Sequence, residues 1–346
     1  MLKQQTVFVV GAGASKEFGL PVGAELAIKI SEKLDVVFDR FGQEIISGDG
    51  DLFRNVTRMH KQDLLQYQKA AWLIRDGIIL AHSIDDFLDV HQHNERLVNY
   101  GKAAIAKCVL EAERTSTLFF DRYAQQIKPG PRTINFRNCA DTWLVGLMRL
   151  LVRGTPHAAR AKIFDRCTFV IFNYDRCVEH FFIQALQRSY DITSDEAIDI
   201  VANAKIYHPY GLAGELGDAT TTGGMVSFGA EQVDFYDIGK RMIKTYTESV
   251  DSKQIKDGII ASEQIVFLGF AYHDQNMRLL ADDKSLDKKT FIGTAFKMSS
   301  SDISAIKHQI DAWEGRTRDA LPPHFFHIDI NSSTAADIFS NYSKSL

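Results

Sequence analysis

The stretch VVGAGASKEFGLPVG, from Val9 to Gly23, decides how the start of this chain folds. It continues the apolar, β-branched run Thr6–Val10, which is typical of a strand buried in a parallel sheet. Near the end of the stretch, Pro21 and the apolar residues that follow at helical spacing up to Leu34 predict a helix. Glycines between a strand and a helix allow the backbone to approach a phosphate closely, because they lack a Cβ atom and the helix start offers free N–H groups. The same residues also suit a tight turn that binds nothing.

The segment Gly11–Ser15 departs from the dinucleotide-binding fingerprint G-x-G-x-x-G, because Lys16 stands where the third glycine belongs. A dehydrogenase would also need a strand that ends in an acidic residue about twenty positions further on, and no such strand follows. Nucleotide binding and a purely structural turn therefore both remain open for this segment.

The composition is that of a globular protein without a strongly charged surface. The chain has 346 residues, of which 45% are hydrophobic and 24% charged, and its formal net charge is −4. This length allows one large or two ordinary domains. Because there is no excess of basic residues, we do not expect nucleic acid as the main ligand and expect it to be involved only indirectly.

The chain has four cysteines, Cys108, Cys139, Cys167 and Cys177, and they form no C-x-x-C pair. We therefore expect neither a zinc ribbon nor a disulfide framework, and no bound metal. The first ten residues lead directly into a predicted strand, and no apolar stretch approaches about 18 residues. These features predict a cytoplasmic protein that does not enter the membrane.

Five further apolar runs predict strands, with helical patterns between them; they span residues 168–172, 204–208, 264–270, 291–296 and 325–330. Strands that alternate with helices predict an α/β fold, here a Rossmann-like parallel sheet with helices on both faces. Residues 35–165 have mixed polar and apolar residues at helical period and are predicted to be a mostly helical insertion. This assigns residues 1–34 and 166–346 to the Rossmann-like domain.

Polar residues and glycines follow the ends of several predicted strands. Asn173 and Asp175 come directly after the second predicted strand, and His208 lies at the end of the third. Gly269 lies near the end of the fourth, and Asp274 follows it. Because the carboxyl ends of parallel strands meet at one edge of the sheet, we expect these residues to share the crevice where open α/β sheets bind ligands. A helix cap is the alternative for Asp175, and a hydrogen-bonded structural role is the alternative for His208.

These motifs resemble those of the SIR2-like, or sirtuin-related, NAD-binding domains. The resemblance rests on GAGAS with GLP (11–15 and 19–21), FNYD (172–175), YHPYG (207–211) and LGFAYHD (268–274). Sirtuins proper carry Q-N-I-D and a catalytic H-G, whereas this chain has Phe172, Tyr174 and Pro209 at the corresponding positions. The N-Y-D sequence makes the chain more similar to the bacterial SIR2-like NAD hydrolases of phage defence than to the deacylases. The helical insertion matches only loosely, chiefly through IDDFL (84–88).

The resemblance implies an NAD⁺ glycohydrolase that produces nicotinamide and ADP-ribose in bacterial antiviral defence. It implies that Asn173 and His208 are catalytic: Asn173 positions a water molecule through its amide, and His208 accepts or relays a proton of a ribose hydroxyl. Nicotinamide leaves readily because its departure neutralises its positive charge, so the reaction needs no metal. The NAD⁺ contacts are expected at Gly11, Ala12, Gly13, Ser15, Pro21, Tyr174, Asp175, Gly269, Phe270 and Asp274, with the pyrophosphate on residues 11–15.

Other functions compete with this prediction. An NAD-dependent protein deacylase would require a zinc-ribbon domain, and the chain has no paired cysteines to form one. A regulatory subunit that senses NAD or ADP-ribose without hydrolysis is the second rival, although it has no need of both Asn173 and His208. A nuclease has little support, because Asp85 and Asp86 lie in a predicted helix without a metal-ligand pattern.

Regulation and assembly are expected from the chemistry. A freely active NAD hydrolase would poison its own cell, so we expect gating by homo-oligomerisation or by a separate sensor, by analogy an ATPase-like or Argonaute-like protein. The helical insertion offers the amphipathic surface that such an assembly would use.

Overall fold

The computed structural model describes residues 2–121, 133–217, 225–245, 248, 252–280, 289–314 and 327–346. Its centre is a six-stranded sheet in the order β10-β9-β8-β1-β4-β5, and every neighbouring pair is parallel. The strands are β1 (Thr6–Val10), β4 (Cys167–Ile171), β5 (Lys205–Tyr207), β8 (Gln264–Leu268), β9 (Thr290–Thr294) and β10 (His327–Asn331). This confirms the predicted α/β, Rossmann-like parallel sheet. The first two residues of the predicted strand 325–330 lie outside the described residues.

The strand order reverses at β1. From β1 the chain adds β4 and β5 on one side, and then returns to add β8, β9 and β10 on the other side. In open α/β sheets such a reversal separates the loops at the carboxyl ends of the strands and creates the usual ligand crevice. The loops after β1, β4, β5 and β8 therefore surround the position where a ligand is expected.

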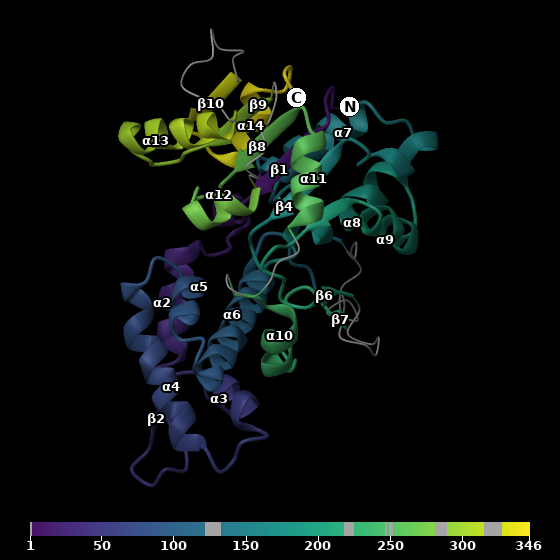
Figure 1. The fold of residues 1–346 in the computed structure, drawn as a ribbon. Helices are drawn as coiled ribbons and strands as arrows, with labels where there is room; N and C mark the ends of the chain where they lie inside the picture. Colours follow the sequence, from purple (N-terminus) through teal and green to yellow (C-terminus); the bar gives the residue numbers. More distant parts are fainter. Residues whose placement is uncertain are drawn as a thin grey trace.

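Helices cover both faces of the sheet, as predicted (Figure 1). Along β1, Phe8 and Val10 belong to one apolar cluster, and Val7 and Val9 belong to the other. The first cluster includes α7 (Trp143–Arg153), α8 (Cys177–Tyr190), α9 (Ser194–Ala202) and α14 (Ala335–Asn341). The second includes α11 (Lys253–Ala261), α12 (Asp274–Leu280) and α13 (Ser300–Asp311). Strands that bury both faces need continuous apolar runs, which explains the sequence of β1, β4 and β8.

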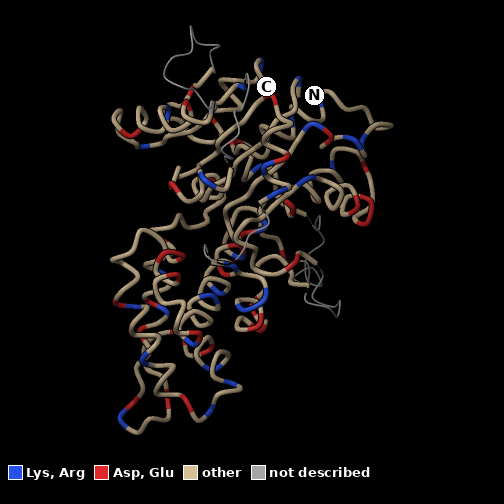
Figure 2. Tube along the Cα trace, in the orientation of Figure 1, with Lys and Arg blue, Asp and Glu red and all other residues tan. Residues whose placement is uncertain are grey.

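A helical lobe extends from one end of the sheet and is drawn at the bottom of Figure 1. Its centre is the long helix α6 (Glu95–Thr115). The helices around α6 are α2 (Gly23–Lys33), α3 (Gly50–Thr57), α4 (Leu64–Gly77), α5 (Ile84–Val90) and α10 (Phe235–Met242), and the lobe also holds the short hairpin of β2 (Val37–Phe38) and β3 (Ile45–Ser47). Figure 2 shows acidic and basic residues interspersed over this lobe.

The packing divides the chain differently from the predicted boundaries at residues 35 and 165. Helices α2 and α10 lie outside that range but pack on α6 in the helical lobe. Conversely, α7 lies inside the range but packs on α8 and α14 beside the sheet. Other short elements include α1 (Ala12–Ser15), β6 (Glu215–Leu216) and β7 (Met225–Val226). Among the described helices, none has the length and apolar character needed to span a membrane.

Candidate functional site

The loops after β1 and β8 pack tightly against each other through glycines. The Gly11 N–H donates to the Leu268 carbonyl and the Gly13 N–H donates to the Gly269 carbonyl, both at 2.9 Å. A Cβ atom on Gly13 would lie 2.9 Å from Gly269 Cα, and Gly269 has a φ of +56° that favours glycine. The glycines are therefore required by this contact between the loops. The sequence interpretation set phosphate against Gly13, but the side where a Cβ would lie is occupied by protein.

Asn173 joins the loop after β4 to the loop after β1. Its side chain is buried, and Nδ2 donates to Ser15 Oγ at 2.8 Å. Ser15 is itself buried at the end of α1. The Asn173 Oδ1 atom makes no hydrogen bond with any of the described residues. The amide is thus oriented at one end and has an acceptor available at the other.

His208 follows β5 and is held at both ring nitrogens. Nδ1 lies 3.2 Å from the Asn173 carbonyl oxygen, and Nε2 lies 2.7 Å from Glu179 Oε1. Both partners are acceptors, so both nitrogens must donate, and the ring then carries a positive charge. Burial lowers the pKa of His208, but the Glu179 carboxylate and the Asn173 carbonyl together hold the pKa above its ordinary value. Burial likewise raises the pKa of Glu179, and the facing imidazolium outweighs it, so that the pKa is lowered.

This geometry limits the predicted role of His208. A cationic ring that donates from both nitrogens has no lone pair with which to accept a proton from a ribose hydroxyl. In the arrangement observed here, His208 instead fixes the backbone of Asn173. Glu179 was not identified from the sequence, because nothing in the pattern of α8 connects it to a histidine 29 positions away.

Tyr174 and Asp175 have other partners. The Tyr174 hydroxyl donates to Asp85 Oδ1, which connects the loop after β4 to α5 of the helical lobe. Burial raises the pKa of Asp85 to about 6, and the tyrosine hydrogen bond opposes that rise. The Asp175 carboxylate accepts the N–H of Cys177 at 3.1 Å, at the start of α8. Asp175 precedes the N-cap residue Arg176, so this contact closes a turn just before α8 and is not the N-cap role that the sequence left as the alternative for Asp175.

Arg176 completes the loop after β4 with a buried ion pair. Arg176 Nη2 and Glu113 Oε2 lie 2.5 Å apart, and the two side chains are 1% and 0% exposed. Burial raises the pKa of Glu113, although the neighbouring Arg176 opposes that rise. Arg176 also donates to the Val226 carbonyl at 2.6 Å, while Glu113 accepts the Gly229 N–H at 3.0 Å. The pair therefore anchors the segment that contains β7 to α6.

The other predicted contact residues differ in their surroundings. Phe270 is buried, and its ring packs on Phe172 at a centroid distance of 5.1 Å. Asp274 is exposed, accepts from Gln309 at 3.1 Å and lines a separate cleft of about 530 Å³. Ala12 and Pro21 are half-buried. The structure thus brings together Ser15, Asn173 and His208, but gives Asp274 a different neighbourhood.

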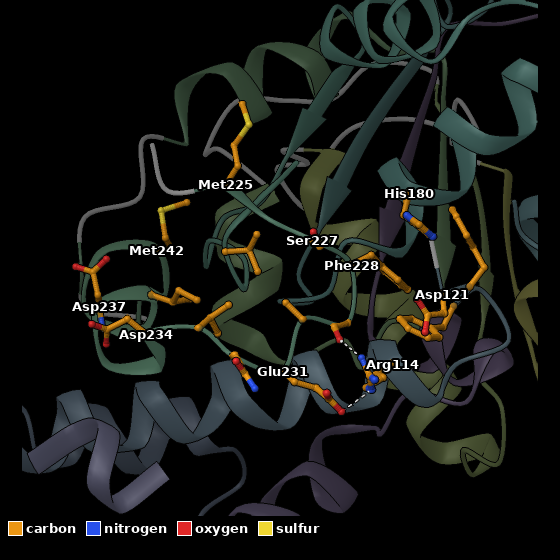
Figure 3. Close-up of a pocket in the computed structure, with 18 of the residues that line it drawn as sticks. Arg114, Asp121, His180, Met225, Ser227, Phe228, Glu231, Asp234, Asp237 and Met242 are labelled. Carbon is orange, nitrogen blue, oxygen red and sulfur yellow. Dashed lines mark hydrogen bonds and ion pairs between the residues drawn. The ribbon is translucent and has the colours of Figure 1, made fainter. Parts of the chain in front are cut away.

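A larger cleft of about 740 Å³ lies between the end of α6, α10 and the segment that follows β7 (Figure 3). Arg114 and Glu231 form an ion pair at 2.6 Å on its wall. His180 and Phe228 stack at 3.9 Å between ring centroids. None of the residues predicted as NAD⁺ contacts lines this cleft.

Comparisons of the chain with protein-family models, with curated proteins and with solved structures found no match. Among the described residues, no group of three or more His, Cys, Asp or Glu side chains is placed to hold a metal ion. The sirtuin-related resemblance therefore stays a prediction from the motifs.

Proposed function

We propose that this chain hydrolyses NAD⁺ to nicotinamide and ADP-ribose at the carboxyl ends of β1, β4, β5 and β8. The observation that carries the proposal is the Asn173 amide, which is buried, oriented by Ser15 and left with a free acceptor among the described residues. It lies at the edge of the sheet where the strand order reverses, the usual ligand position of open α/β sheets.

In the proposed hydrolysis, the main task of the protein is to position the substrate and the attacking water. The bond between ribose C1′ and the nicotinamide nitrogen breaks, and its electron pair neutralises the pyridinium charge. A water molecule forms the new C–O bond and releases its second proton to solvent. Asn173 Oδ1 would accept a hydrogen bond from this water and direct its lone pair at C1′, a contribution of about 10²-fold or more when the geometry is well held.

Within this proposal His208 is a positioning residue. Its Nδ1–H holds the Asn173 carbonyl and its charge is balanced by Glu179. To transfer a proton as the sequence predicts, the ring would have to give up its hydrogen bond to Asn173 or to Glu179 and form one with a ribose hydroxyl. The pyrophosphate remains assigned to residues 11–15, and the outer contacts remain assigned to Pro21, Gly269, Phe270 and Asp274.

We further propose that activity is gated by assembly, through homo-oligomerisation or a separate ATPase-like or Argonaute-like sensor in antiviral defence. The support is the distribution of apolar surface: of the fourteen large apolar residues exposed among the described residues, ten lie between Ile28 and Val90 in the helical lobe. These side chains are the candidates for a surface that another protein covers, provided that they form a contiguous patch.

A regulatory subunit that binds NAD or ADP-ribose is the second candidate. The observation that favours it is the pairing of both His208 nitrogens, which leaves His208 without a lone pair to act as a base. Such a site is compatible with binding without turnover.

One experiment separates the two candidates. The purified full-length chain is incubated with NAD⁺, alone and with its genomic neighbour, and nicotinamide and ADP-ribose are quantified by chromatography. The Asn173→Ala variant tests the site, and Asn203→Ala, an exposed asparagine after α9, is the matched control. Loss of product with Asn173→Ala alone supports the hydrolase. Binding of NAD⁺ by calorimetry without any product supports the sensor, and neither binding nor product contradicts both.

A further inference from the structure

A groove of about 430 Å³ lies between α7 and α8, and none of the residues of the proposed site lines it. The apolar residues that line it are Phe136, Val145, Met148, Val152, Phe181 and Ala185. Phe136 closes part of the floor, with its ring edge against Phe181 at a centroid distance of 5.7 Å. This volume is sufficient for a few apolar side chains.

Three arginines surround this apolar floor. Arg149 and Arg153 belong to α7, Arg188 belongs to α8, and all three are exposed. None of them forms an ion pair or hydrogen bond with any of the described residues. The last turn of a helix favours a cation, which suits Arg153 and Arg188. Arg149 has no such support, and it lies one turn before Arg153, where two like charges on a helix repel.

We propose that this groove binds an acidic amphipathic helix of a partner protein. Arg149 and Arg153 are four residues apart, so they repeat about every 6 Å along α7. Glutamates at positions i and i+4 of a second helix have the same repeat and would face the two arginines. The apolar residues of that helix, one turn apart, would then enter the groove. A membrane surface fits less well, because the apolar lining residues are buried or half-buried whereas the arginines are exposed.

The proposal does not depend on the reaction assigned above. Its test uses the full chain and a synthetic, fluorescein-labelled helical peptide with leucines on one face and glutamates at i, i+4 beside them. A matched peptide carries glutamine in place of each glutamate. We expect micromolar binding of the acidic peptide by fluorescence anisotropy, weakened by added salt, and about tenfold weaker binding of the glutamine peptide.

Variants of the chain locate the binding. The double variant Arg149→Gln/Arg153→Gln should lose about tenfold in affinity, and Arg40→Gln in the helical lobe, another exposed arginine, should lose none. The charge-reversed variant Arg149→Glu/Arg153→Glu should bind a lysine peptide in place of the acidic one. Because these side chains are exposed, melting temperatures should stay within about 2 °C of the parent chain.

Several results would overturn the proposal. They are no binding of the acidic peptide at about 100 µM, equal affinity for the glutamine peptide, or affinity that does not change in the arginine variants. Arginine-dependent binding to phosphatidylserine vesicles without peptide binding would assign the groove to a membrane. Self-association that Arg149→Glu abolishes would assign it to a second copy of the chain.

Discussion

Replacement of Asn173 by alanine is the sharpest test of the proposed site. The change removes the amide and its 2.8 Å hydrogen bond to Ser15. Loss of one buried hydrogen bond costs about 1–2 kcal/mol of folding free energy. For a chain of this size, with an unfolding entropy of about 2.1 cal/mol/K per residue, that corresponds to about 1–3 °C in melting temperature. The variant should therefore remain folded at 25 °C.

Turnover of NAD⁺ should fall far more than stability. If Asn173 Oδ1 directs the attacking water, kcat should drop by about 10²-fold or more, which is roughly 3 kcal/mol of transition-state stabilisation. KM should change little, because the contacts to the rest of NAD⁺ remain. Ser15→Ala keeps the amide but frees it to rotate, so we expect an intermediate loss of about tenfold. The double variant should be no slower than Asn173→Ala alone, since the two residues act as one unit.

The assay follows nicotinamide release by chromatography, with melting temperature and circular dichroism measured on the same samples. A folded Asn173→Ala variant that hydrolyses NAD⁺ at nearly the parent rate would refute the assignment. Losses for Ser15→Ala and Asn173→Ala that simply add would show that the hydrogen bond between them does not serve catalysis.

Three further substitutions test the surroundings of the site. Glu179→Gln should destabilise the chain by about 1–3 kcal/mol. The raised pKa of His208 and the lowered pKa of Glu179 make this loss of stability depend on pH. In thermal unfolding, the difference between variant and parent should be largest between about pH 4.5 and 6.5, and should shrink as the pH rises through the folded pKa of His208. A difference that stays constant from about pH 5 to 9 would contradict the ion pair. Gly269→Ala should lower the free energy of unfolding, measured with denaturant, by about 3 kcal/mol or more, because the residue has a positive φ and the added Cβ would collide with backbone. A variant as stable as the parent chain would exclude the tight contact between the loops. Tyr174→Phe should destabilise the chain by about 1–3 kcal/mol near pH 8, where Asp85 is ionised, and by less near pH 5; equal effects at both would contradict the Asp85 contact.

The sheet could be predicted from the sequence because its signal is local. A strand buried on both faces needs an unbroken apolar run, and the runs at 6–10, 168–172 and 264–270 correspond to β1, β4 and β8. The sequence has no comparable local pattern that shows which helices belong to the helical lobe. Helix α2 directly follows the loop after β1 and α10 comes late in the chain, but both pack on α6, because their apolar faces meet that helix in space. Periodicity identifies an apolar face and does not identify what it contacts.

The candidate site likewise has residues that the sequence predicts and partners that it does not. Asn173, His208 and the glycines were found because topology brings the carboxyl ends of parallel strands together. Their partners were not found: Asp85 is 89 positions from Tyr174. Glu113 is 63 positions from Arg176, with no motif around it. Single acidic residues on helices are ordinarily solvated, so only the tertiary packing distinguishes these from the rest.

The loop after β4 explains why a short motif can locate a site without specifying its activity. Its four consecutive residues, 173–176, bond to four different places: the loop after β1, α5 of the helical lobe, the start of α8, and α6 with β7. Irregular backbone between a strand and a helix directs successive side chains to different sides, so no single element orients this loop. The orientation of the Asn173 amide therefore depends on the helical lobe as much as on the sheet. A displacement of α5 would reach Asn173 through Tyr174 alone, and a displacement of α6 would reach it through Arg176 and the two residues before it. The same four residues without those helices would keep the motif and lose the geometry.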